Sequence, residues 1–279
     1  MSLMRRPMGR AGSEASDGRL LRQADHNFAG TWQRMLDASP NGRSWRADGA
    51  LCTDSGHPIS SFNTAFVARD RPLDGHSIAS LQAPYLQTKT RYRLCVGAAQ
   101  SRAAADLLRS AGLRRSSEAP LMALKTDGEP SGTRSGTTVA GLRVAVVAGS
   151  QTLEDFRVVA AQAYQIPSWL AAEVLTAPFM LDDNVQGIVG YVADQPVTAA
   201  MVSWAGGVAG IYWVGTITAA RGKGYGDSIT RLAVAAAGAR TADWVVLQAS
   251  AMGEPLYRRM GFVTSDAYVS WVGGGPGYD

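Results

Sequence analysis

The sequence predicts an α/β (α+β) protein, and three observations carry this prediction. Strand and helix patterns fill residues 141–273 in the order β-α-α-β-β-β-α-β-α-β. A glycine-rich turn at 221–226 separates an apolar strand pattern at 211–217 from a helix pattern. A buried strand pattern at 244–250 precedes a short helix that ends at a glycine.

Composition divides the chain into two halves of similar size. The 279 residues are enough for two domains, and the 46% hydrophobic content supplies both with cores. Residues 1–24 contain arginines but no apolar core, so we expect a disordered tail rather than a secretory signal. Residues 125–140, rich in Gly, Ser and Thr, are typical of a linker. The expected domains are therefore 25–124 and 141–279.

The C-terminal half has a clear local signal for each element. Leu153, Phe156, Ala160 and Tyr164 recur at helical spacing, and a turn at 194–195 joins two strand patterns into a hairpin. The expected strands are 142–147, 186–192, 197–204, 211–217, 244–250 and 267–272. Helices are expected from 152, after Pro167, from 227 and after Pro255.

The N-terminal half has weaker patterns. Its expected elements are a helix at 32–36, strands at 50–53, 62–67 and 91–96, a helix at 102–112, and a strand at 121–124. This order echoes the C-terminal half, with Gly112-Leu113 where the other half has Gly261-Phe262. The half is either a second copy of the same unit or an unrelated small α/β domain.

The turn from Arg221 to Gly226 has the character of a phosphate site. Its glycines can adopt positive φ and allow the backbone to approach a ligand closely. Successive N–H groups in such a turn converge on an anion, and the following helix dipole adds positive partial charge.

Three other structures have glycine turns of similar composition. A Rossmann fingerprint requires Gly-x-Gly-x-x-Gly, but here Asp227 occupies the slot of the third glycine. A Walker loop requires Ser or Thr after its lysine, and Lys223 is followed by Gly224. A purely structural glycine turn is the third alternative.

The pattern Arg-x-x-Gly-x-Gly between a strand and a helix resembles the pyrophosphate loop of the GCN5-related N-acetyltransferases (GNAT family). Arg221, Gly224 and Gly226 match its defining positions. The later run from 251 to 262 resembles the family's short helix that carries a tyrosine and ends in Gly-Phe, with Tyr257 at the tyrosine position. The resemblance implies a GNAT fold, a mixed and mostly antiparallel sheet flanked by helices, with a second, smaller and degenerate GNAT-like N-terminal domain that lacks the loop.

The resemblance also implies functional roles. It makes acetyl-CoA the cosubstrate, with no metal, and Tyr257 the candidate acid beside the coenzyme A sulfur. A backbone N–H of the fourth strand, around 215–217, would serve the thioester carbonyl oxygen. The implied cofactor-binding residues are Gly215, Thr216, Ile217, Arg221, Gly222, Lys223, Gly224, Tyr225, Gly226 and Asp227.

Residue types limit the chemistry of the C-terminal half. Both cysteines, Cys52 and Cys95, and the three histidines lie before residue 96. A Ser-His-Asp triad, a Cys-His pair or a histidine zinc site within the C-terminal half is therefore excluded. Direct transfer from cosubstrate to acceptor fits this inventory. We expect the cysteines to be buried free thiols.

The general base is not assigned. Many relatives have a carboxylate on the fourth strand, but residues 208–220 contain neither Asp nor Glu. The remaining candidates are Glu173, Asp182, Asp183 and Glu254, each of which could equally be a solvated surface acid. A chain of water molecules is the alternative.

Two further groups of side chains have either a functional or a structural role. Lys223 and Arg231 either approach phosphates or face water. Tyr164, Trp169, Met180 and Trp213 either line the acceptor pocket or belong to the core.

Charge and hydropathy exclude some partners. The net charge is +4 with scattered arginines, which does not indicate nucleic-acid binding. No apolar run approaches the roughly 20 residues of a membrane span. We expect a cytoplasmic N-acetyltransferase that acts on a small-molecule or peptide amine, with a homodimer as a possible assembly. The alternative function is a noncatalytic acyl-CoA-binding sensor.

Overall fold

The computed structural model describes residues 10–126, 139–240 and 242–275. Within these ranges, 11 strands form one sheet in the order β1-β2-β3-β4-β11-β5-β10-β9-β8-β7-β6. The strands are β1 Arg43–Ala47, β2 Ala50–Asp54, β3 Thr64–Phe66, β4 Tyr92–Gly97, β5 Arg114–Lys125, β6 Arg143–Val146, β7 Val185–Val192, β8 Gln195–Ala205, β9 Val208–Thr216, β10 Trp244–Gln248 and β11 Val263–Gly273.

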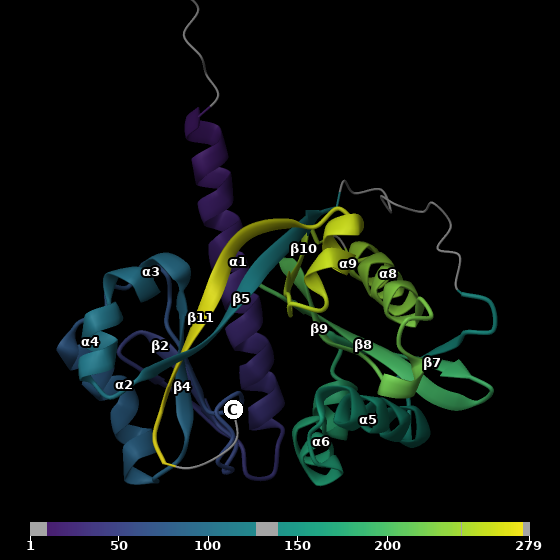
Figure 1. The fold of residues 1–279 in the computed structure, drawn as a ribbon, viewed down its shortest axis with the longest axis horizontal. Helices are drawn as coiled ribbons and strands as arrows, with labels where there is room; N and C mark the ends of the chain where they lie inside the picture. Colours follow the sequence, from purple (N-terminus) through teal and green to yellow (C-terminus); the bar gives the residue numbers. More distant parts are fainter. Residues whose placement is uncertain (1–9, 127–138, 241, 276–279) are drawn as a thin grey trace, which may run out of the picture.

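Helices flank this sheet on both faces (Figure 1). They are α1 Arg10–Asp37, α2 Gly75–Gln87, α3 Ala98–Ala103, α4 Ala105–Ser110, α5 Ser150–Tyr164, α6 Ser168–Val174, α7 Ala177–Met180, α8 Tyr225–Gly238 and α9 Glu254–Arg259, with a 3₁₀ turn at Thr218–Ala220. The expected mixed, mostly antiparallel sheet is confirmed, because only β3–β4 and β9–β10 pair in parallel. Among the described residues, no helix is both long and apolar enough to cross a membrane.

The two halves repeat one topology and then exchange their last strands. β1 to β4 and β7 to β10 each form an antiparallel run of three strands followed by a parallel fourth. β5 then pairs with β10 of the other half, and β11 pairs with β4. These two long strands also pair with each other, and Figure 1 shows them crossing between the halves.

The core of the C-terminal half has two layers because its strands are buried on both faces. Ala199 and Met201 of β8 face the cluster that contains α5, whereas Ala200 and Val202 face the cluster that contains α8. Successive side chains of a strand point to opposite faces. A strand buried on both sides therefore has a continuous apolar sequence, as β8 does.

Helix α1 corrects part of the expected disordered tail. Residues 10–24 are helical, and Leu20 and Ala24 are buried in a core that both halves share. The apolar stripe is sparse among polar neighbours, so composition alone did not indicate it. Residues 1–9 lie outside the described residues, as do 127–138 of the expected linker.

Elements of the N-terminal half were also missed or shortened. β1 carries two arginines, and α2 contains Pro84, so neither has a simple pattern. The strand expected at 121–124 is the end of a 12-residue strand, β5, whose exposed start is polar. Pairing with β11 extends β5 where its own sequence gives little strand signal.

The two cysteines are buried free thiols, as expected. Burial raises the pKa of Cys52 to about 12 and that of Cys95 to about 11. Both thiols are therefore protonated near neutral pH.

Exchange of the last strands predicts that the halves unfold together. Trp271 on β11 is 1% exposed in the core of the N-terminal half, and its Nε1 donates to Ser101 Oγ at 2.9 Å. Trp271→Ala should lower the free energy of unfolding by about 3–5 kcal/mol. Urea unfolding followed by tryptophan fluorescence and far-UV circular dichroism should give one shifted transition for the whole chain.

Val263→Ala is the matched control on the same strand, because Val263 is 58% exposed. It should change the free energy of unfolding by less than about 1 kcal/mol. Two separate transitions, with only one shifted by Trp271→Ala, would contradict the expectation.

Candidate active site

A gap opens between the parallel strands β9 and β10. They pair only at Val245–Ala209 and Val246–Gly210. From Ile211 onward β9 has no partner on that side, although it continues to pair with β8 as far as Thr216. Two strands that pair at one end and diverge at the other leave backbone groups and side chains facing the space between them.

A bulge lies on β9 beside this gap. The β8–β9 register shifts between Ala199 and Met201, so that Trp213 and Val214 stand opposite one residue. Trp213 has φ of 53°, an unusual conformation for a bulky residue. Tyr164 Oη donates to the Val214 carbonyl at 3.1 Å and fixes the bulge from α5. A bulge takes one residue out of regular pairing and so re-aims its backbone groups.

The strand beyond the bulge is more regular. Gly215 and Thr216 pair with β8, and the Ile217 N–H donates to the Val197 carbonyl at 3.0 Å. The Ile217 N–H is therefore occupied, which corrects its inclusion among the candidate donors to a carbonyl oxygen. The bulge, three and four residues earlier than Ile217, places further backbone groups beside the gap.

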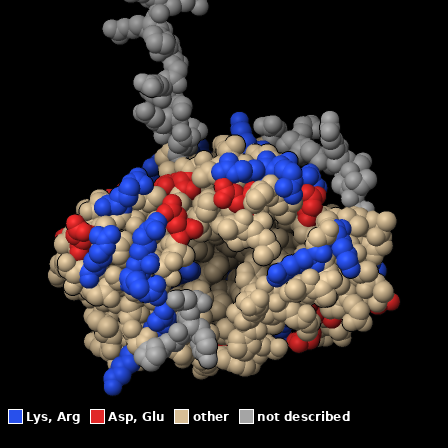
Figure 2. Space-filling model, in the orientation of Figure 1, with Lys and Arg blue, Asp and Glu red and all other residues tan. Residues whose placement is uncertain are grey.

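A cavity of about 370 Å³ lies at the gap. Both halves contribute to it, and Figure 2 shows the molecule hollowed between them. Its lining includes Trp32, Phe62, Arg93, Tyr164, Trp213 and Tyr257. Ser117 of β5 and Ser270 of β11 also line it, as a direct consequence of the strand exchange.

Tyr257 lies in this cavity from the side of β10. It is 7% exposed, on a helix that begins at Glu254, and its ring packs 5.9 Å from that of Phe262. A Cβ at Gly253 would lie 2.8 Å from the ring, so this glycine makes room for Tyr257. Burial raises the pKa of Tyr257 to about 12. The phenol is thus a neutral O–H donor throughout the physiological pH range.

The predicted phosphate turn forms an open helix N-terminus. Gly222 and Gly224 have φ of 74° and 83°. Gly224 is the N-cap of α8 and supplies no side-chain cap. The first helical backbone bond runs from the Ser228 N–H to the Gly224 carbonyl, at 3.0 Å. The preceding N–H groups at the start of α8 therefore have no intrahelical acceptor, and they are suited to an anion.

The charged side chains at the turn have mostly structural partners. Arg221 donates through Nε to the Thr216 carbonyl at 3.1 Å and so ties the turn to β9. Arg231 forms an ion pair with Asp227 at 2.7 Å. Lys223 is exposed. Backbone N–H groups, rather than Arg221 or Arg231, are the groups left available to an anion.

The equivalent helix of the N-terminal half is closed. Asp74 caps α2, its carboxylate accepts from the Ser77 N–H at 2.8 Å, and the Asp74 N–H donates to Ser77 Oγ. Hydrogen bonds from the backbone N–H and side chain of Ser77 to the carboxylate lower the pKa of Asp74. A negative charge already occupies the place where an anion would bind. The capping box Asp-x-x-Ser is visible in the sequence and marks this difference.

The four candidate bases do not line the cavity. Glu173 accepts from Asn41 Nδ2 at 2.6 Å and lies 2.8 Å from His57 Nε2, so it joins α6 to the N-terminal half. Glu254 pairs with Arg258 at 2.6 Å. Asp182 and Asp183 lie at the start of β7, away from the gap. Among the described residues, the cavity lining contains no carboxylate.

Two of the four predicted acceptor-pocket residues line the cavity. Tyr164 and Trp213 do, with ring centroids 5.1 Å apart. Met180 is in the core, and Trp169 is 53% exposed and packs on His57. Sequence reasoning missed the contribution of the N-terminal half, because no local pattern shows that β4 and α1 face the gap. An arginine inside an apolar strand, Arg93, was the available signal.

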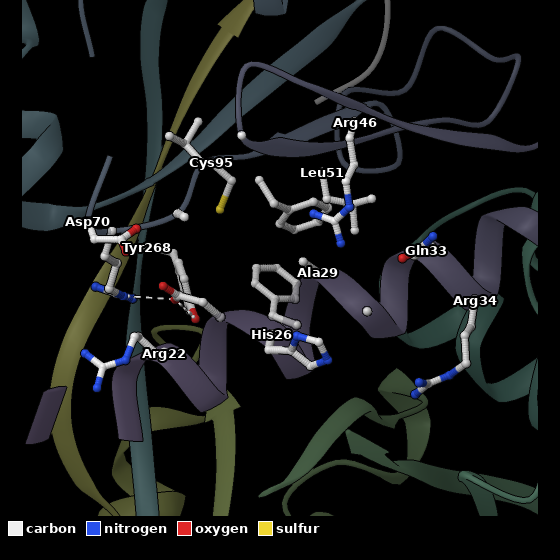
Figure 3. Close-up of a pocket in the computed structure, with 18 residues that line it drawn as sticks. Arg22, His26, Ala29, Gln33, Arg34, Arg46, Leu51, Asp70, Cys95 and Tyr268 are labelled. Carbon is white, nitrogen blue, oxygen red and sulfur yellow. Dashed lines mark hydrogen bonds and ion pairs between the residues drawn. The ribbon is translucent and has the colours of Figure 1, made fainter. Parts of the chain in front are cut away.

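A second cavity of about 380 Å³ lies beside α1, and it shares Phe28, Cys95 and Tyr268 with the first. Arg69 pairs with Asp25 at 2.9 Å and with Asp266, while Tyr268 Oη donates to Asp25 at 2.7 Å. Figure 3 shows Arg22, His26, Arg34 and Arg46 around it.

The second cavity is lined by both carboxylates and arginines, whereas the described lining of the first contains Arg93 and no carboxylate. One arginine, Arg69, pairs there with two carboxylates, Asp25 and Asp266, and burial raises the pKa of Asp25 despite Arg69. Among the described residues, no group of three or more His, Cys, Asp or Glu side chains is arranged to hold a metal ion.

Comparison with solved structures identifies the fold. A GCN5-related N-acetyltransferase from Kribbella flavida is 20% identical, with a TM-score of 0.63 and 97% of each chain covered. A tandem GNAT protein from the clavulanic acid biosynthesis pathway is 14% identical, with a TM-score of 0.60, covering 96% of this chain and 97% of its own.

A GCN5-related N-acetyltransferase from Sphaerobacter thermophilus is 17% identical, with a TM-score of 0.60, covering 85% of this chain and 78% of its own. No protein-family model and no curated protein matches the sequence. The chain therefore has the GNAT fold in a tandem arrangement, as the resemblance implied.

The close contact between Gly253 and Tyr257 generates a prediction. Gly253→Ala places a methyl group 2.8 Å from the Tyr257 ring, so it should displace the ring and lower the free energy of unfolding by about 1–3 kcal/mol. Gly238→Ala is the control, because nothing lies within 4 Å of its added Cβ. That variant should be neutral or slightly stabilising in thermal unfolding. Equal melting temperatures for the two variants would refute the proposed packing.

Proposed function

We propose that this protein is an acetyl-CoA-dependent N-acetyltransferase that transfers an acetyl group directly to a primary amine of a small molecule or peptide. One observation carries the proposal. The open helix N-terminus at Gly224 and the cavity at Tyr257 flank the same strand divergence. An elongated molecule with an anionic middle and a reactive thioester end suits that arrangement, and the GNAT fold of the chain supports it.

The residues at the turn fit the diphosphate of coenzyme A. The N–H groups at the start of α8 point out of the helix without intrahelical acceptors, and the helix dipole favours negative charge there. Glycine at 222 and 224 permits the φ values of 74° and 83° that shape the turn. Arg221 positions the turn through the Thr216 carbonyl rather than through phosphate.

The residues of the cavity fit amine acylation. Bound acetyl-CoA supplies an acyl thioester that a neutral amine can attack. A backbone N–H of the bulge at Trp213–Val214 is the candidate hydrogen-bond donor to a carbonyl oxygen in the gap, and such preorganised donors contribute about 3–4 kcal/mol. Tyr257 is the candidate donor to the departing sulfur.

Tyr257 acts as a hydrogen-bond donor rather than a full acid in this proposal. Its pKa is raised to about 12, whereas a thiol resembling cysteine has a pKa near 8.5. Complete proton transfer to the thiolate would then be uphill by about 5 kcal/mol. A hydrogen bond that strengthens as negative charge develops on sulfur avoids this cost.

Among the described residues, no carboxylate of the cavity lining can accept the proton of the amine. An alkylammonium has a pKa near 10.4, so an acceptor for its proton is needed at neutral pH. Because no Asp or Glu lines the cavity among the described residues, water reached from the cavity is the proposed acceptor. The same observation favours a second candidate function, a noncatalytic acyl-CoA-binding sensor.

Measuring free thiol released from acetyl-CoA across a panel of amines separates the two candidates. Amine-dependent release supports the transferase. Tight binding of acetyl-CoA by calorimetry with no release on any amine supports the sensor. Absence of acetyl-CoA binding would refute both.

The turn generates a binding prediction. Gly224→Ala forces a side chain into a conformation with φ of 83°, which shifts the N–H groups at the start of α8. The Kd for acetyl-CoA, measured by calorimetry, should rise about tenfold or more. Gly112→Ala is the matched control, since it has φ of 79° and lies at the end of a helix in the N-terminal half. It should bear similar strain and leave the Kd unchanged.

Tyr257 generates a kinetic prediction. Tyr257→Phe should lower kcat by about 10²-fold while the Kd for acetyl-CoA and the melting temperature stay close to those of the wild type. Burial raises the pKa of Tyr257 from its ordinary value near 10 to about 12, so the phenol stays protonated at higher pH. The pH profile of the wild-type rate should therefore show no fall caused by Tyr257 below about pH 11. An unchanged rate in Tyr257→Phe at saturating acetyl-CoA removes this residue from the mechanism.

A further inference from the structure

Arg93 is an ionised side chain without an acidic partner in the cavity. It projects from β4 of the N-terminal half and lines the cavity together with Tyr257 of the C-terminal half. Among the described residues, no carboxylate lies within ion-pairing distance of its guanidinium. Burial lowers the pKa of Arg93, but an arginine stays charged in a protein. Arg93 is half-buried. A partly desolvated charge of this kind is stabilised by a bound counter-ion.

The hydrogen bonds of Arg93 leave one edge of its guanidinium free. Nε donates to Thr64 Oγ1 at 2.9 Å, and Nη2 donates to the Ser61 carbonyl at 3.2 Å. These two bonds use the side edge formed by Nε and Nη2. Guanidinium has five N–H donors, so the end edge formed by Nη1 and the second Nη2 proton remains. That edge matches the two oxygens of a carboxylate.

Neither of the bonds that Arg93 makes requires a positive charge. A hydroxyl and a peptide carbonyl accept equally well from a neutral amide, so a structural tie to the 61–64 segment does not explain an arginine. Cys95, two residues along the same strand, does not compensate the charge, because burial raises its pKa to about 11 and keeps the thiol neutral.

The walls between Arg93 and the strand gap are aromatic. Phe62, next to the Ser61 carbonyl that Arg93 contacts, stacks on Trp213 with 6.3 Å between ring centroids. Trp32 Nε1 donates to the same carbonyl at 2.9 Å. Trp213 belongs to the bulge beside the gap. An acceptor that reaches from the gap to Arg93 therefore passes along apolar rings.

We propose that the acceptor is an amine with a carboxylate at the far end of an apolar body, and that Arg93 binds this carboxylate through its end edge. This inference rests on the proposed acetyltransferase function and names its substrate class. The N-terminal half, which has a closed helix N-terminus, thereby contributes specificity to the site of the C-terminal half.

The test uses amines in matched pairs that differ only in a carboxylate or a carboxamide, with the full chain at saturating acetyl-CoA. Suitable pairs are 6-aminohexanoate with 6-aminohexanamide and 4-(aminomethyl)benzoate with its amide. For the wild type, kcat/KM should favour the carboxylate by about tenfold or more. Arg93→Met should remove this preference, mainly through a higher KM for the carboxylates.

Two controls keep the result interpretable. Arg115→Met removes a half-exposed arginine that pairs with Glu118 on β5, and it should preserve the carboxylate preference. Arg93→Lys retains the charge without the fork, so it should recover part of the preference if Arg93→Met is unstable. The Kd for acetyl-CoA should be the same in all four proteins.

The possible failures are distinguishable. Turnover of the amides that equals or exceeds that of the carboxylates overturns the role of Arg93 and leaves the acetyltransferase proposal intact. No thiol release with any amine overturns the acetyltransferase proposal. In that case, calorimetry of 6-aminohexanoate with wild type and Arg93→Met decides the binding claim, and equal affinities overturn it.

Discussion

The exchange of β5 and β11 is the constraint on which the rest of the structure depends. Each strand follows its own half in sequence but pairs with the fourth strand of the other half. One continuous sheet results, and neither half has a complete sheet without the other. Arg93, Ser117 and Ser270 face one cavity with Tyr257 because of this pairing. The candidate site is thus a product of the whole chain rather than of one domain.

Helix α1 joins the two halves from one face of the sheet. The buried Asn27 donates to the Ser203 and Val208 carbonyls at 2.9 and 3.1 Å and accepts from Tyr212 Oη at 2.7 Å. The next residue, Phe28, packs against aromatic rings from both halves. Satisfied polar groups and packed rings of this kind fix a relative position more firmly than apolar burial alone. They set the wall of the cavity opposite the strand gap.

The two halves differ at the N-terminus of one equivalent helix, which is α8 in the C-terminal half and α2 in the N-terminal half. In the C-terminal half, Gly224 leaves the first N–H groups of α8 open, whereas Asp74 fills the equivalent position on α2 with its own carboxylate. A single capping residue therefore closes a helix N-terminus that glycine leaves open. The N-terminal half retains the topology, and with Arg93 it retains a face toward the site. Under the proposed function, this half would shape acceptor binding without binding the cosubstrate.

The sequence by itself determined the local elements and motifs. Strand and helix patterns located most of the C-terminal half. The glycine spacing of 222–226 indicated a turn, and the family resemblance selected Tyr257, which lies in the cavity. Only the tertiary structure decided which strands pair across the halves, that residues 10–24 are helical, and that Arg93 shares a cavity with Tyr257. Strand pairing joins residues far apart in the chain, and no local pattern encodes the partner of an exchanged strand. The unpaired charge of Arg93 is likewise a property of its surroundings, which exist only after folding.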